Sequence, residues 1–119
     1  HIIWCPKFRY AVLGGNRGDV LKEILCQICT EQGYIIKALE VMPDHIHIFA
    51  DIPHTVAPSD AVRILKSLSA RRMFAVYPSL KSFYRKCGHL WSRGSFVSSI
   101  GHVSAETVKR YIEEQKHGR

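Results

Sequence analysis

The segment that decides the fold is residues 34–51, YIIKALEVMPDHIHIFAD. Its first half, Tyr34 to Met42, is rich in Ile and Val, and its second half, His45 to Asp51, begins with alternating polar and apolar side chains. Both patterns are typical of β-strands. Pro43 and Asp44, between the two halves, favour a tight turn. The segment therefore predicts a β-hairpin.

The sequence on either side of this hairpin predicts two further strands and three helices. We expect strands at 1–5 and 90–100, the second interrupted near Arg93-Gly94, and helices at 19–31, 59–77 and about 104–116. Asp19, Ser59 and Ser104 are the expected N-caps, and Gly33 is the expected C-cap. Residues 79–89 are basic and show no regular pattern.

The order of these elements predicts the fold class. Strand, helix, strand, strand, helix, strand, helix is the order of a mixed α/β (α+β), ferredoxin-like or RRM-like fold. We expect an antiparallel sheet with helices on one face, plus an appended C-terminal helix. The 119 residues form one domain, 1–119, and a hydrophobic content of 46% excludes intrinsic disorder.

The first residues, the lack of a long apolar run and the cysteines indicate the cellular compartment of the protein. No run of about 18 apolar residues could span a membrane, and the first residues lack the pattern of a signal peptide. We therefore expect a cytoplasmic protein, and His1 in place of an initiator Met suggests a segment of a slightly longer chain. Cys26 and Cys29 lie inside a predicted helix, so we expect the cysteines to be buried, reduced thiols rather than a zinc or redox site.

The charge points to a polyanionic partner. Lys and Arg number 17 against 10 Asp and Glu, which gives a net charge of +7. These cations are spread through the chain among aromatic residues, which suits single-stranded nucleic acid better than a membrane surface. Five of them are candidate phosphate contacts: Lys7, Arg9, Lys66, Arg71 and Arg72.

Two histidines on the second hairpin strand form half of a metal site. Side chains alternate along a strand, so His45 and His47 leave the same face with their backbones roughly 6.6 Å apart. Two imidazoles at that spacing can converge on one ion. Taken alone, the pair also fits structural or solvated histidines.

The last predicted helix carries a phenol and an amide on one face. Tyr111 and Gln115 are four residues apart, so they lie one above the other. The hydroxyl of Tyr111 could act as a nucleophile and the oxygen of Gln115 as a metal ligand. The alternative is a tyrosine at the edge of the core beside an exposed glutamine.

Four stretches together resemble a known family. They are HIIWCPK at 1–7, VMPDHIH at 41–47, LWSRG at 90–94 and VKRYIEEQ at 108–115. The sequence resembles the single-tyrosine HUH transposases, which are the TnpA proteins of the smallest bacterial and archaeal insertion sequences, and the related transposases associated with repetitive extragenic palindromes (REP). Ser95 departs from the pattern, because a larger, usually aromatic residue is expected there.

The resemblance implies a function. It implies a transposase that cleaves and rejoins single-stranded DNA, with Tyr111 forming a 5′-phosphotyrosine intermediate. By the same likeness, His45, His47 and Gln115 bind a divalent ion, for which we expect Mg²⁺, with Mn²⁺ as a substitute. The expected partners are hairpin-containing transposon ends and a second copy of the chain, whose tyrosine helix can complete the site in trans.

Two other functions fit the residues. The first is a non-catalytic ferredoxin-like module that binds single-stranded nucleic acid by stacking. The second is a metal-dependent nuclease that uses water. Stacking needs only the ring of Tyr111, whereas nucleophilic attack needs its hydroxyl. Removing that hydroxyl therefore distinguishes the enzyme from the binding module.

Overall fold

The computed structural model describes residues 1–98 and 105–118. The elements in chain order are β1 (Ile2–Trp4), the short 3₁₀ helix η1 (Lys7–Arg9), α1 (Asn16–Gln32), β2 (Ile35–Met42), β3 (His45–Asp51), α2 (Pro58–Val76), α3 (Pro78–Phe83), β4 (Phe96–Val97) and α4 (Ala105–Gly118). The strands pair antiparallel in the order β2-β3-β1-β4. The predicted α+β, ferredoxin-like fold with its appended C-terminal helix is confirmed.

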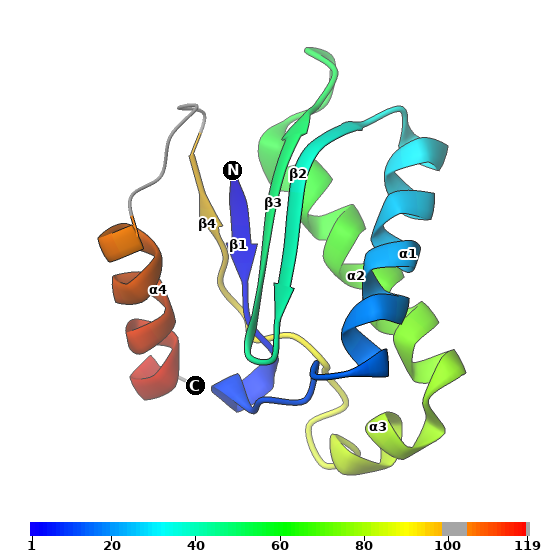
Figure 1. Ribbon diagram of the computed structural model, residues 1–119, viewed down its shortest axis with the longest axis vertical. Coiled ribbons are helices and arrows are strands. Elements are labelled where there is room, and N and C mark those ends of the chain that lie inside the picture. The colour runs from blue at the N-terminus through cyan, green and yellow to red at the C-terminus, as the bar shows by residue number, and fades with distance from the viewer. Residues whose placement is uncertain (99–104, 119) are drawn as a thin grey trace.

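One face of the sheet carries the main core. Ile46 and Ile48 of β3 pair with Trp4 and Ile2 of β1, and all four are buried. Figure 1 shows α1 and α2 on this side of the sheet, with α4 beside β4 on the other. The core face therefore leaves the alternate residues of β3, including both histidines, on the opposite face.

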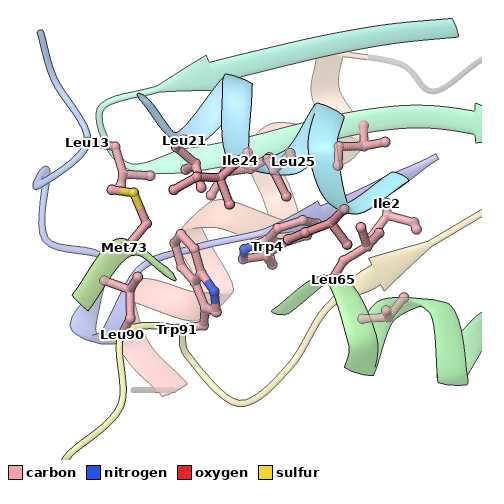
Figure 2. Close-up of a cluster of buried hydrophobic side chains, with 14 of the residues drawn as sticks. Ile2, Trp4, Leu13, Leu21, Ile24, Leu25, Leu65, Met73, Leu90 and Trp91 are labelled. Atoms are coloured by element: carbon pink, nitrogen blue, oxygen red, sulfur yellow. The ribbon is translucent and has the colours of Figure 1, made fainter. Parts of the chain in front are cut away.

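Trp4 lies at the centre of this core. Leu21 and Leu25 of α1 and Leu65 of α2 surround it (Figure 2). Its ring meets Trp91 edge to face, with the ring centroids 5.8 Å apart. This packing ties the segment after α3 to β1 and holds the sheet between its helices.

The two N-caps predicted within the described residues are wrong. Helix α1 begins after Gly15, which places Asp19 in its first turn, where a carboxylate favours the helix dipole. Helix α2 begins after Ala57, because Pro58 has the fixed φ that suits the first helical position. Gly33 is the C-cap, with the predicted left-handed φ of 80°. The third predicted cap, Ser104, lies outside the described residues.

Two further boundaries differ from the prediction. Residues 78–83, expected to be largely irregular, form the short helix α3. Within the described part of the segment 90–100, only β4 forms a strand, and Trp91 forms an isolated bridge with Pro6. Residues 99–100 lie outside the described residues. The interruption expected near Arg93-Gly94 is confirmed, and the ammonium of Lys66 hydrogen-bonds the backbone oxygens of 92–94 there.

All four cysteines are free within the described residues. Cys5 and Cys29 are buried as predicted and Cys87 is half-buried, but burial is a wrong prediction for Cys26, which lies at an exposed position of α1. Across residues 1–98 and 105–118, no helix is long and apolar enough to cross a membrane.

Candidate active site

Four residues form a row across the open face of the sheet. Phe96 of β4 pairs with Ile3, Ile3 pairs with His47, and His47 pairs with Glu40 of β2. Directly paired residues point to the same face. His45 lies two residues before His47 on β3, so both imidazoles belong to this face.

The imidazole of His45 is oriented by Asp44. Its Nδ1 lies 3.0 Å from Asp44 Oδ1, and the other carboxylate oxygen lies 3.3 Å from Nε of Arg9. When Nδ1 donates to a carboxylate, Nε2 keeps its lone pair, which is the arrangement that commonly prepares a histidine for a metal. The carboxylate therefore fixes both the ring and its donor atom.

His47 has a partner that the sequence analysis missed. Its Nε2 lies 2.9 Å from Nδ1 of His1, whose ring stacks on Phe49 at 4.5 Å. Burial lowers the pKa of His47, and the nearby carboxylate of Glu40 opposes this shift. A neutral imidazole is the form that binds a metal ion. The pairing of Ile3 with His47 brings His1 here, and no local motif reveals that register.

Helix α4 packs on the open face through a second, smaller apolar cluster. Ile3 and Cys5 are buried there beside Tyr111, with Phe96, Val108 and Ile112 packed around them. Tyr111 is only 9% exposed, and its ring centroid lies 6.4 Å from that of Phe96. Ile3 therefore contacts the tyrosine cluster and pairs with His47, so the phenol and the imidazoles share one face.

The hydroxyl of Tyr111 is engaged in this arrangement. It donates a hydrogen bond of 3.1 Å to the backbone oxygen of Gly94. Burial raises the pKa of the phenol well above its usual value, and the neighbouring Cys5 thiol adds to that shift. The neutral form of the phenol is therefore favoured in this arrangement.

The described residues supply two of the three expected metal ligands. The His45 ring is oriented by Asp44, and burial favours the neutral form of His47, which is the form that binds a metal ion. Gln115 belongs to α4, one turn after Tyr111, and its side chain lies outside the described residues. No group of three His, Cys, Asp or Glu in the described part of the chain could hold a metal. A divalent ion held by these two imidazoles would need further oxygen ligands.

Three of the five candidate phosphate contacts bind groups of the protein itself. Arg9 pairs with Asp44 and donates to the backbone oxygen of Ile112 at 3.4 Å. Arg72 forms an ion pair of 2.8 Å with Glu31.

Lys66, the third, stabilises the loop between Trp91 and β4. Its Nζ lies 2.8 Å from the oxygen of Ser92, 3.1 Å from that of Gly94 and 3.2 Å from Oγ of Ser95. Burial lowers the pKa of Lys66 to about 8. The lysine and Tyr111 therefore share the carbonyl of Gly94.

The other two candidates, Lys7 and Arg71, lie at the surface. Arg71 is exposed on α2. Lys7 lines a hollow of about 550 Å³ together with Arg63, Lys66, His89 and Arg93. The structure thus adds basic residues to the surface that the sequence analysis did not single out.

Known proteins share this sequence and fold. The family model described as "Transposase IS200 like" matches residues 1–115. The ISDra2 transposase TnpA of Deinococcus radiodurans is 39% identical over 115 residues, which cover 97% of this chain and 81% of that protein. The transposase for insertion sequence element IS200 of Salmonella typhimurium is 30% identical over 121 residues, covering 99% and 79%.

Two solved structures share the fold. A crystal structure from Deinococcus radiodurans R1, described as that of a transposase, has a TM-score of 0.88 and 38% identity over 96% of this chain and 87% of its own. A REP-associated tyrosine transposase bound to a REP hairpin has a TM-score of 0.55 and 18% identity over 98% and 66%, which shows the fold alone. On this evidence the chain belongs to the IS200-like family of insertion-sequence transposases.

Proposed function

We propose that this transposase cleaves and rejoins single-stranded DNA through a 5′-phosphotyrosine on Tyr111. In this proposal His45, His47 and Gln115 hold a divalent ion, with Mg²⁺ as the expected metal and Mn²⁺ as a substitute. The observation that carries the proposal is the shared sheet face. The tyrosine helix packs on Ile3, which pairs directly with His47.

The proposed reaction is a transesterification. The phenol oxygen of Tyr111 forms a bond to phosphorus, the bond to the 3′-oxygen breaks, and the phenol proton is released as the 3′-hydroxyl forms. One phosphodiester replaces another, so a later 3′-hydroxyl can attack the same phosphorus and join strands. The divalent ion, when bound, supplies polarisation of the phosphate and neutralises developing negative charge.

The protein must make the phenol reactive. An ordinary phenol has a pKa of about 10 and is about one-thousandth ionised at pH 7. Burial of Tyr111 moves its pKa further from neutrality, and its proton is donated to the oxygen of Gly94. The proposal therefore requires the tyrosine to exchange the Gly94 carbonyl for the phosphate when DNA binds.

The proposed substrate is a hairpin-containing transposon end bound by a homodimer. The positive hollow around Lys7 and Arg93 supports a DNA ligand. The REP-associated transposase of the same fold, which is bound to a REP hairpin, supports the hairpin. In a dimer, the tyrosine helix of one copy could serve the imidazoles of the other.

A covalent-adduct assay tests the chemistry. The protein is incubated with a single-stranded hairpin oligonucleotide and Mg²⁺, and the adduct is separated by denaturing electrophoresis. Tyr111→Phe should abolish the adduct, because the ring remains and only the nucleophilic oxygen is lost. Tyr77→Phe is the matched control and should retain the adduct, since the Tyr77 ring lies 5.6 Å from the Arg17 guanidinium and packs on the main core rather than in the cluster of Tyr111. Chelation of divalent ions should also abolish it.

Other outcomes of this assay contradict the proposal in different ways. An undiminished adduct in Tyr111→Phe would exclude this phenol as the nucleophile. Strand cleavage without an adduct would indicate a nuclease that uses water. Binding without cleavage would indicate the non-catalytic module.

A further inference from the structure

An aromatic cluster lies at the surface, away from the proposed catalytic residues. Phe8, Tyr10 and Phe83 are 46%, 48% and 59% exposed. Phe8 lies in η1, Tyr10 directly follows η1, and Phe83 ends α3. Figure 1 places these elements at the end of the molecule where the β2–β3 turn also lies. Single exposed rings are ordinary, but three neighbouring ones from two separate segments form a patch.

The rings are arranged as one continuous group. The centroid of Tyr10 lies 5.5 Å from that of Phe8 and 5.5 Å from that of Phe83. Tyr84 lies beneath them, is 2% exposed and stacks with Tyr10 at 6.3 Å. The buried ring thus contacts Tyr10 and Phe83, and Tyr10 contacts Phe8. We call the three exposed rings the aromatic platform: Phe8, Tyr10 and Phe83.

The backbone that presents this platform adopts an unfavourable conformation. Phe8 and Arg9 have φ values of 62° and 54°, in the left-handed region that non-glycine residues rarely occupy. The hydroxyl of Tyr84 fixes this segment by donating to the oxygen of Lys7 at 3.1 Å, and Lys7 N donates to Leu90 O at 2.7 Å. The strained backbone leaves the Phe8 ring half in solvent, so burial of that ring does not explain the conformation.

The charge around the platform is positive. Nζ of Lys7 lies 5.5 Å from the centroid of Phe8. The platform lines a hollow of about 580 Å³ that Arg85 and Lys86 also line. Among the described residues that line it there is no carboxylate. Exposed rings beside cations match a polymer that alternates flat bases with phosphates.

We propose that the aromatic platform binds unpaired bases of single-stranded DNA by stacking, with Lys7, Arg85 and Lys86 on the adjacent phosphates. The inference rests on the proposed function only in taking single-stranded DNA as the substrate.

Arg9 directly follows Phe8 and bonds both Asp44 and the backbone oxygen of Ile112. Asp44 in turn bonds His45. The residue next to Phe8 is therefore in contact with both the hairpin turn and α4, the two elements that carry the proposed catalytic residues.

A binding measurement with two probes tests the platform. The probes are oligothymidine of about 12 nucleotides and an abasic strand of the same length, which has the phosphates without the bases. The variant is Phe8→Leu with Phe83→Leu, which keeps apolar bulk and removes two ring faces. It should bind oligothymidine on the order of tenfold more weakly in fluorescence anisotropy, and the abasic strand equally well. Ile35→Leu, at a 60% exposed position on β2, is the control and should change neither affinity.

Two other results of this binding experiment would overturn the inference. Unchanged oligothymidine binding by the double variant would indicate that the platform serves another kind of partner, such as a protein. Equal losses for both strands would indicate lost phosphate contacts or a disturbed fold rather than lost stacking. Binding is measured in a chelator, so it does not depend on catalysis. A wild-type protein that binds oligothymidine through the platform but forms no adduct would overturn the proposed function alone.

A photochemical measurement on the unaltered protein avoids dependence on the variant's folding. Strands that carry 5-iodouracil cross-link to aromatic side chains with which the base stacks. The cross-linked peptides should contain Phe8, Tyr10 or Phe83. Cross-links confined to other peptides would overturn the platform even if the double variant failed to fold.

Discussion

Lys66 shows how a single side chain can serve the structure when the sequence suggests surface chemistry. A lysine on a basic helix predicts a phosphate contact, yet its Nζ donates to the oxygens of Ser92 and Gly94. The second of these oxygens also accepts the hydroxyl proton of Tyr111. Lys66 therefore positions the carbonyl that holds the proposed nucleophile.

Lys66→Met should destabilise the protein. The substitution keeps an unbranched apolar chain as far as Cε and removes the ammonium, so several backbone oxygens lose a charged donor. The free energy of unfolding should fall by about 1–3 kcal/mol in urea denaturation. Lys22→Met, at an exposed position of α1, should change it by less than about 0.5 kcal/mol. Equal stability of the two variants would show that the loop does not depend on this ammonium.

At the scale of elements, the local patterns predicted some boundaries and missed others. The hairpin was predictable because its strand residues, turn and alternation all agree, and β3 runs over His45–Asp51 as expected. The N-caps were not predictable. Asp19 and Ser59 are residue types that favour N-caps, but both helices begin earlier, so Asp19 lies one turn inside α1 and Ser59 lies one residue inside α2. Before β4, the backbone oxygens of Ser92 and Gly94 bind Lys66, a contact 26 to 28 residues away in sequence that no local pattern reveals.

The docking of α4 should control the ionisation of Tyr111. Burial raises the pKa of this phenol, so docking favours its neutral form. Docking is therefore unaffected below about pH 10 and weakens as the pH rises above it, because only the undocked phenol ionises there. Val108→Asp places a carboxylate in the apolar cluster and should release the helix, so that Tyr111 titrates near pH 10.

The measurement is an ultraviolet titration of phenolate absorbance. The contribution of Tyr111 is the difference between each protein and the same protein with Tyr111→Phe. Val76→Asp, at a 52% exposed position of α2, is the control and should leave the pKa of Tyr111 raised. A pKa near 10 in the wild-type protein would mean that α4 is not docked in solution.

At the scale of the whole molecule, the sequence predicted the residue types of the site better than their contacts. Period-two alternation alone placed His45 and His47 on one face, and helical spacing placed Gln115 one turn after Tyr111. The partners of these residues depend on strand register and on packing between distant segments. The contact of His1 with His47, and the hydrogen bond from Tyr111 to Gly94, therefore could not be predicted from local spacing.

The availability of each cation behind the net charge of +7 also depends on contacts between distant segments, and two adjacent arginines test this. Arg71 is exposed, whereas Arg72 is paired with Glu31 at 2.8 Å.

Affinity for single-stranded DNA should fall with salt, with a logarithmic slope of about 0.7 per phosphate contact. Arg71→Gln should reduce the slope by about 0.7, and Arg72→Gln should leave it unchanged, because that guanidinium is already neutralised within the protein. The measurement is anisotropy of a labelled hairpin between about 50 and 300 mM salt. Equal reductions in both variants would mean that the Glu31 pair opens to bind DNA, and no reduction in either would remove this face of α2 from the DNA path.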